Sequence, residues 1–367
     1  MTEESSGPWP KKSTPAIRGP AAFSSGGHCS GRRPPTDIPW ALNPPGAATP
    51  YTPSQPFLVA AVQISPAFLD REATVDRACE AIATAAARGA RLVVFPEAFV
   101  PGYPLWVWTI AAGRTHDHRA LYAELLDQAV TIPSAAVGRL CDAAREAGVY
   151  VAIGVNERNT ERSGTSLYNA LLFIGADGEL LGVHRKLVPT AGERLVHAQG
   201  DGSSLTVYDT ALGRLAGLIC WENYMPLARQ ALYDAGVGLH VAPTWDRGEP
   251  WLSTLRHIAK EGRVYVIGCC SAMRPDDIPD RFDFKAGVHV SASGWINPGD
   301  SAIVDPDGKV LAGPLHEEQG MLIAEVDPQR ITGPRWQLDV AGHYARPDVL
   351  ELVRRGRAGA VAVHEQS

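Results

Sequence analysis

Residues 57–97 read FLVAAVQISPAFLDREATVDRACEAIATAAARGARLVVFPE, and this stretch decides the fold class. FLVAAVQIS (57–65) is rich in Val, Ile and Ala, which predicts a buried strand. The following apolar residues recur three and four apart, as on one face of a helix: Val75, Ala78, Ile82 and Ala85. RLVVFPE (91–97) predicts a second strand, which Pro96 ends. A strand, a helix and a strand in succession indicate an α/β protein.

The rest of the chain continues this alternation and then turns to hairpins. The pattern predicts helices over residues 118–130, 134–147, 225–236 and 251–263. It predicts strands over residues 150–158, 205–210, 213–220, 238–245, 264–272 and 320–327. Two hairpins are predicted, over 166–186 around Asp177-Gly178 and over 301–314 around Asp307-Gly308. Such a mixture predicts mixed sheets with helices outside, and the lack of GxGxxG or P-loop motifs disfavours a nucleotide-binding fold.

Composition excludes several classes of protein. The 367 residues carry 34 basic and 40 acidic side chains, a net charge of −6, which argues against a nucleic-acid partner. No apolar run approaches the roughly 20 residues that a membrane-spanning helix needs. We therefore expect a protein that binds neither nucleic acid nor membrane.

The first 56 residues differ from the rest in composition. They contain 12 of the 29 prolines and show no hydrophobic period, so we expect residues 1–56 to be a disordered extension. No apolar segment typical of a secretory signal follows their basic residues, which favours a cytoplasmic location. Among six cysteines there is no CxxC pair, and His116 and His118 lack a third ligand, so no metal site is expected.

Three chemically capable side chains follow predicted strands: Glu97, Lys186 and Cys220. A thiol at a strand-to-helix turn meets backbone N–H groups, which would lower its pKa and favour the thiolate. A carboxylate shielded by aromatic residues would have a raised pKa, as a general base requires. A lysine beside them would stabilise developing negative charge. Each residue taken singly is more often structural: a buried small hydrophobe, a turn glutamate or a solvated lysine.

The sequences around these residues resemble the catalytic blocks of the nitrilases, a branch of the carbon–nitrogen hydrolase superfamily. The matching blocks are FPEAFVPGYPLW (95–106), HRKLVPTAGER (184–194), CWENYMPLAR (220–229) and GHYARPDVL (342–350). The resemblance implies a single-domain, four-layer α-β-β-α sandwich with mixed sheets over residues 57–335. It further implies that residues 336–367 make oligomer contacts before a disordered tail, and that homodimers build into a larger homo-oligomer or spiral.

The same resemblance implies a role for each residue. Cys220 would be the nucleophile, Glu97 the general base and Lys186 the stabiliser of the transition state, with Glu193 in support. Trp221 and Glu222 after the cysteine resemble the branch that cleaves nitriles. The implied reaction converts an organic nitrile and water to a carboxylic acid and ammonia through a thioimidate and a thioester, with no cofactor and no metal.

Substrate and assembly stay open at this stage. Candidates for the substrate pocket are Tyr103, Trp106, His197, Trp221 and Trp245. His197 and Ala198 stand where typical nitrilases have Trp and Gly, so substrate size is in question. Alternatives on the same scaffold are an amidase, an N-carbamoyl hydrolase or a cyanide hydrolase. A catalytically silent scaffold protein is the alternative outside enzymes.

Overall fold

The computed structural model describes residues 55–355, which belong to one compact unit. Most of the predicted disordered extension and the last 12 residues lie outside this range. The helices are α1 (Arg71–Ala87), α2 (Thr115–Gln128), α3 (Ala135–Ala147), α4 (Pro226–Asp234), α5 (Gly248–Gly262) and α6 (Thr332–Gln337). Every predicted helix is present, with bounds that shift by a few residues.

Strands of the described range form two mixed sheets. The first has the order β13-β1-β2-β3-β4-β5. Its strands are β1 (Phe57–Gln63), β2 (Ala90–Val94), β3 (Tyr150–Asn159), β4 (Ser166–Ile174), β5 (Leu180–Arg185) and β13 (Gly320–Val326). In it β1, β2 and β3 are parallel neighbours, because α1 and α3 cross over between them, and the other pairs are antiparallel.

The second sheet has the order β10-β11-β9-β8-β7-β6, with β12 paired to β11. Its strands are β6 (Tyr208–Thr210), β7 (Gly213–Gly217), β8 (Leu239–Thr244), β9 (Tyr265–Cys270), β10 (Ala272–Met273), β11 (Asn297–Val304) and β12 (Val310–His316). Here β7, β8 and β9 run parallel, and their crossovers are α4 and α5. Both predicted hairpins form, as β4–β5 and β11–β12.

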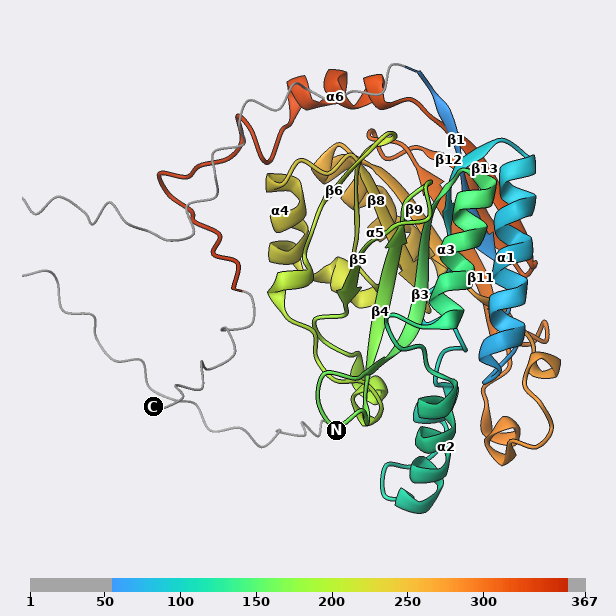
Figure 1. The fold of residues 1–367 in the computed structure, drawn as a ribbon. Coiled ribbons are helices and arrows are strands. Elements are labelled where there is room, and N and C mark those ends of the chain that lie inside the picture. Colours follow the sequence, from blue (N-terminus) through green and yellow to red (C-terminus); the bar gives the residue numbers. More distant parts are fainter. Residues whose placement is uncertain (1–54, 356–367) are drawn as a thin grey trace, which may run out of the picture. The chain divides into compact units, whose positions relative to one another are not determined.

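Three apolar layers hold these elements together. Figure 1 shows α1 and α3 side by side against one sheet, and their buried faces include Ile82 and Leu140. Side chains from both sheets, among them Leu92 and Val241, form the layer between the sheets. A further layer lies between α4, α5 and the second sheet, where Trp251 is buried. The predicted four-layer α-β-β-α sandwich is confirmed.

Two predicted strands end earlier than the sequence suggested. β2 ends at Val94, so Glu97 lies in the loop beyond it, because Pro96 has no N–H to continue the ladder. β7 ends at Gly217, and Cys220 begins a short 3-10 helix, η4 (Cys220–Tyr224). Both changes place a chemically capable side chain on a loop at a strand end rather than within a sheet.

Gly154 on β3 allows the Glu97 loop to approach the sheet. A β carbon at this position would lie 2.2 Å from the carbonyl oxygen of Pro96 and 2.6 Å from the amide nitrogen of Ala98. Real β carbons do not tolerate such distances from backbone atoms. A side chain at residue 154 would therefore displace Glu97.

We expect Gly154→Ala to lower the free energy of unfolding by about 1–3 kcal/mol, because overpacking against backbone cannot be relieved by a rotamer change. Urea titration measures this change. The matched control is Gly138→Ala inside α3, where a β carbon meets nothing within 4 Å. The control should be neutral or stabilising, since alanine favours a helix more than glycine does. Equal stability of the two variants would contradict the crowding argument.

Candidate active site

Cys220 lies where the second sheet meets a strained turn. Its φ of 54° falls in the left-handed region, which costs a non-glycine residue about 1–3 kcal/mol. The Asn223 side-chain amide donates to the carbonyl oxygens of Leu218 (2.8 Å) and Cys220 (2.9 Å) and so fastens the turn. The Thr244 hydroxyl at the end of β8 donates to the Cys220 sulfur at 3.2 Å. The thiol is buried, with 4% of the residue exposed.

A buried histidine fixes the orientation of Asn223. His240 Nε2 lies 2.7 Å from Asn223 Oδ1. Burial lowers the pKa of His240 to about 3, so the ring is neutral at physiological pH and Nε2 carries the proton that it donates. The Arg229 guanidinium donates to the backbone oxygen of Asn223 at 2.6 Å. Asn223 is thereby held with its amide group toward the Cys220 carbonyl.

Lys186 follows β5 and lies between two carboxylates. Its ammonium nitrogen is 2.6 Å from Glu97 Oε1 and 2.8 Å from Glu193 Oε2, and all three residues are 1% exposed. Burial alone would lower the pKa of Lys186, but the negative charges of Glu97 and its neighbours outweigh it and raise that pKa. The lysine is therefore a permanently charged cation at the centre of the site.

Glu97 is held by three donors. Lys186 and the Asn169 side-chain amide (2.8 Å) bind Oε1, and the backbone N–H of Trp245 donates to Oε2 at 2.7 Å. Burial raises the pKa of Glu97 against the lowering effect of Lys186. A carboxylate with a raised pKa is a stronger base than an exposed one, which suits proton transfer near neutral pH.

Glu193 lies in the 3-10 helix η2 (Ala191–Leu195). Its side-chain Oε2 caps the start of this helix by accepting a hydrogen bond from the backbone N–H of Thr190 at 2.9 Å. The Tyr103 hydroxyl donates to the other oxygen at 2.8 Å, and the Tyr103 ring stacks on Trp245 at 4.8 Å between centroids. Glu193 thus joins the lysine to the aromatic wall of the site.

Beside these groups is a cavity of about 450 Å³. Its walls are largely aromatic and apolar, and Cys220 and Glu193 are among the residues that line it. Three of the predicted pocket residues line it: Tyr103, Trp221 and Trp245. The Trp221 ring is half exposed, and its Nε1 donates to Asp246 Oδ2 at 2.9 Å.

Trp106 and His197, the other two pocket candidates, do not border the cavity. In the 3-10 helix η1 (Leu105–Trp108), residues three apart share a face, so Leu105 and Trp108 line the cavity while Trp106 turns into the core. His197 Nε2 lies 2.8 Å from Asn156 Oδ1 behind the site, and burial lowers its pKa to about 4.

The expected low thiol pKa was wrong. Burial, followed by the charge of Glu97, raises the pKa of the Cys220 thiol, and Lys186 offsets this only in part. The turn is a 3-10 helix of five residues, too short for a dipole that would stabilise a thiolate against two buried carboxylates. The resting sulfur therefore carries its proton.

Sequence reasoning missed the residues that position these groups. Asn169, Thr244 and His240 lie within strands or at their ends and carry no motif of their own. Glu222 was taken only as a marker of the branch. In the structure it accepts from the backbone N–H groups of Ile219 (2.8 Å) and Leu187 (2.6 Å), which ties the nucleophile turn to the segment after Lys186.

Known proteins share this chain's sequence and fold. Residues 58–335 match the carbon-nitrogen hydrolase family. An aliphatic nitrilase of Sinorhizobium fredii (strain HH103) is 42% identical over 299 residues, which cover 81% of this chain and 95% of that protein. Nitrilase 1 of Arabidopsis thaliana is 40% identical over 316 residues, covering 83% and 89%. The fold also matches a crystal structure, that of Saccharomyces cerevisiae Nit3, a member of branch 10 of the nitrilase superfamily. The TM-score is 0.61 and the sequence identity 23%, and the match covers 81% of this chain and 98% of that one.

The chain belongs to the carbon–nitrogen hydrolase family, in its nitrilase branch. The resemblance found in four sequence blocks is therefore confirmed. Within residues 55–355 of this nitrilase, no group of three or more His, Cys, Asp or Glu side chains is arranged to hold a metal ion. Over the same part of the chain, no helix is long and apolar enough to cross a membrane.

We expect the rate at which iodoacetamide alkylates Cys220 to keep rising with pH through pH 9. The reason is that the raised thiol pKa keeps the thiolate a minor form at lower pH. Peptide mass spectrometry measures the modification at each cysteine, and Cys220→Ser gives the background. A plateau below pH 8 would show that the thiolate is already formed at neutral pH, which the burial argument excludes.

Proposed function

We propose that this nitrilase hydrolyses an organic nitrile with an uncharged, largely apolar side group to a carboxylic acid and ammonia. The observation that carries the proposal is that Cys220 lines the cavity while the charges of Glu97 and Lys186 act on its thiol from the buried cluster beside it. The contacts of Lys186 with both glutamates and the aromatic walls of that cavity support it. Two relatives that are named nitrilases support the substrate class.

In the first step, the Cys220 sulfur attacks the nitrile carbon while its proton passes to Glu97. One π bond of the C≡N group breaks, its electron pair goes to the nitrogen, and the nitrogen takes the proton back from Glu97, so that a thioimidate results and Glu97 is again a carboxylate. Lys186 and the backbone N–H of Trp221 face the charge that develops on this nitrogen. Lys186 is already fixed in place before the charge develops, so the site does not have to reorganise during the reaction. Such preorganised charges account for most electrostatic catalysis.

In the second step, Glu97 takes a proton from a water molecule that attacks the thioimidate carbon. The tetrahedral intermediate expels ammonia and leaves a thioester, which a second water molecule hydrolyses to the acid and the free thiol. The balance is one nitrile and two waters to one acid and one ammonia. Expulsion of the thiol in place of ammonia would release an amide, so a minor amide product is part of the proposal.

The test is ammonia release from a panel of aryl, arylacetic and aliphatic nitriles. We expect turnover of at least one class by the wild-type protein, and a loss of at least about 10³-fold in Cys220→Ser with an unchanged thermal unfolding curve. Glu97→Gln should also abolish turnover, since an amide cannot accept the proton. The same panel as amides separates the rivals, because amide turnover far above nitrile turnover would favour an amidase.

A folded wild-type protein that releases no ammonia from any nitrile would refute the proposal. Release from inorganic cyanide alone would instead favour a cyanide hydrolase. The silent scaffold predicts no turnover of any of these compounds.

We further propose a cytoplasmic homodimer that builds into a larger homo-oligomer through residues 336–355. Large apolar side chains of this segment are exposed in the single chain: Trp336, Tyr344, Val349 and Leu350. Such a series on a monomer surface favours a protein contact. The extension 1–56 is proposed to lie outside the catalytic domain of residues 57–335.

Sedimentation velocity of the full chain tests this assembly. Replacing Trp336, Tyr344 and Leu350 by serine should shift the protein to smaller species, because their burial between subunits is lost. The matched control is Val290→Ser, an exposed apolar residue outside the segment. An unchanged distribution of the triple variant would contradict the proposed contact.

A further inference from the structure

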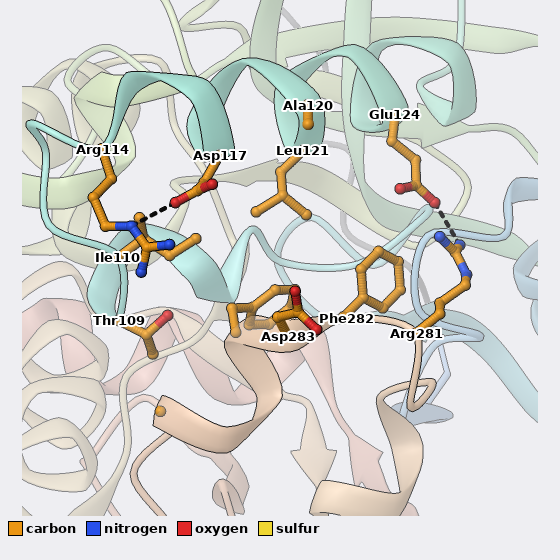
Figure 2. A pocket seen from close by; sticks show the side chains of 12 residues that line it. Thr109, Ile110, Arg114, Asp117, Ala120, Leu121, Glu124, Arg281, Phe282 and Asp283 are labelled. Atoms are coloured by element: carbon orange, nitrogen blue, oxygen red, sulfur yellow. Dashed lines mark ion pairs between the residues drawn. The ribbon is translucent and has the colours of Figure 1, made fainter.

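A second cavity of about 420 Å³ adjoins the catalytic one and has no part in the mechanism above. It lies between α2 and residues 281–287, which include the 3-10 helix η6 (Asp283–Gly287). Figure 2 shows the ion pairs Arg114–Asp117 and Arg281–Glu124 toward its two ends, with Leu121 and Phe282 between them. The middle of this cavity is lined by the apolar side chains of Leu121 and Phe282 together with Asp283, and each of the two arginines is engaged by a carboxylate.

Two residues border both cavities, Thr109 and Gly287. A β carbon built on Gly287 would have Thr109 Cβ as its nearest neighbour, at 3.6 Å, which is ordinary van der Waals contact. The Thr109 side chain is fixed by its hydroxyl, which donates to the backbone oxygen of Trp106 at 3.3 Å. A threonine side chain packed close to a glycine thus forms a thin partition between two spaces of similar size.

We propose that the partition of Thr109 and Gly287 sets the length limit of the nitriles that this enzyme accepts. The second cavity is the subsite that an uncharged alkyl or aryl tail enters once the partition is thinned. The inference rests on the proposed function, because it takes the cavity at Cys220 as the place where the nitrile group reacts. The ligand class follows from Leu121 and Phe282, which offer the tail an apolar contact, and from the carboxylates that line the second cavity, which disfavour an anionic tail.

The test compares straight-chain nitriles of increasing length on the wild-type protein and Thr109→Ala. We expect the ratio of kcat/KM for long to short nitriles to rise in the variant, by about fourfold for each methylene group that enters the second cavity. Gly287→Ala added to Thr109→Ala should lower the ratio again, since the added methyl group thickens the partition from the other side. Gly287 has no positive φ, so alanine fits its backbone.

The matched control is Thr131→Ala. Thr131 also donates its hydroxyl to a nearby backbone oxygen, that of Pro133 at 3.2 Å, and it borders neither cavity. Its length profile should match that of the wild type. Adding Leu121→Phe to Thr109→Ala fills the second cavity and should remove the gain for long nitriles. If this double variant does not fold, Ile110→Phe added to Thr109→Ala replaces it.

Two outcomes overturn the inference: a length profile that Thr109→Ala leaves unchanged, or a gain that neither filling substitution removes. Failure of the proposed function is seen separately, as absence of ammonia from the short nitriles. The length profile can then still be read by calorimetry with the corresponding straight-chain carboxylic acids as ligands. Tighter binding of long acids by Thr109→Ala than by the wild type supports the partition, and equal binding refutes it.

Discussion

The buried contact of Lys186 with two carboxylates governs the chemistry of this site. One cation between Glu97 and Glu193 leaves the cluster with a single net negative charge, sheltered from water. Burial, together with the second negative charge that ionising the neighbouring thiol would add, explains the raised thiol pKa. In the proposed mechanism, passing the sulfur proton to Glu97 during attack keeps the total charge of the protein groups and substrate constant. The new charge then develops on the substrate nitrogen, opposite the lysine.

This arrangement depends on the packing of one sheet on the other. Glu97 and Lys186 follow β2 and β5 of the first sheet, whereas Cys220 follows β7 of the second. The apolar layer between the sheets fixes their separation, and the Trp245 backbone, after β8, binds Glu97 across it. Loss of core packing far from the cavity would therefore change the distance between Glu97 and Cys220.

The fold was predictable because its elements are long and strongly patterned, as in the strand at residues 57–65 and the helix that follows. Glu97, Lys186, Cys220 and Glu193 were predicted as site residues because their flanking blocks resemble a family. The thiol pKa was predicted wrongly, since burial and the charges of distant residues cannot be seen in a local motif. Trp106 shows the same limit: only the 3-10 geometry of η1 reveals that Leu105 and Trp108 face the cavity.

The buried charged cluster and most of the cavity wall belong to different parts of the molecule. Glu97, Lys186 and Glu193 are each held by several buried hydrogen bonds, so a change at one of them alters the charge and contacts of the others. Much of the cavity wall comes from η1, the segment after β8 and residues 287–296, and the wall contacts the buried glutamates through Tyr103 and the Trp245 backbone. Substitutions in these walls can alter the volume open to a substrate while Glu97, Lys186 and Cys220 keep their contacts. Relatives that share the buried cluster are thus free to differ in the nitrile they accept.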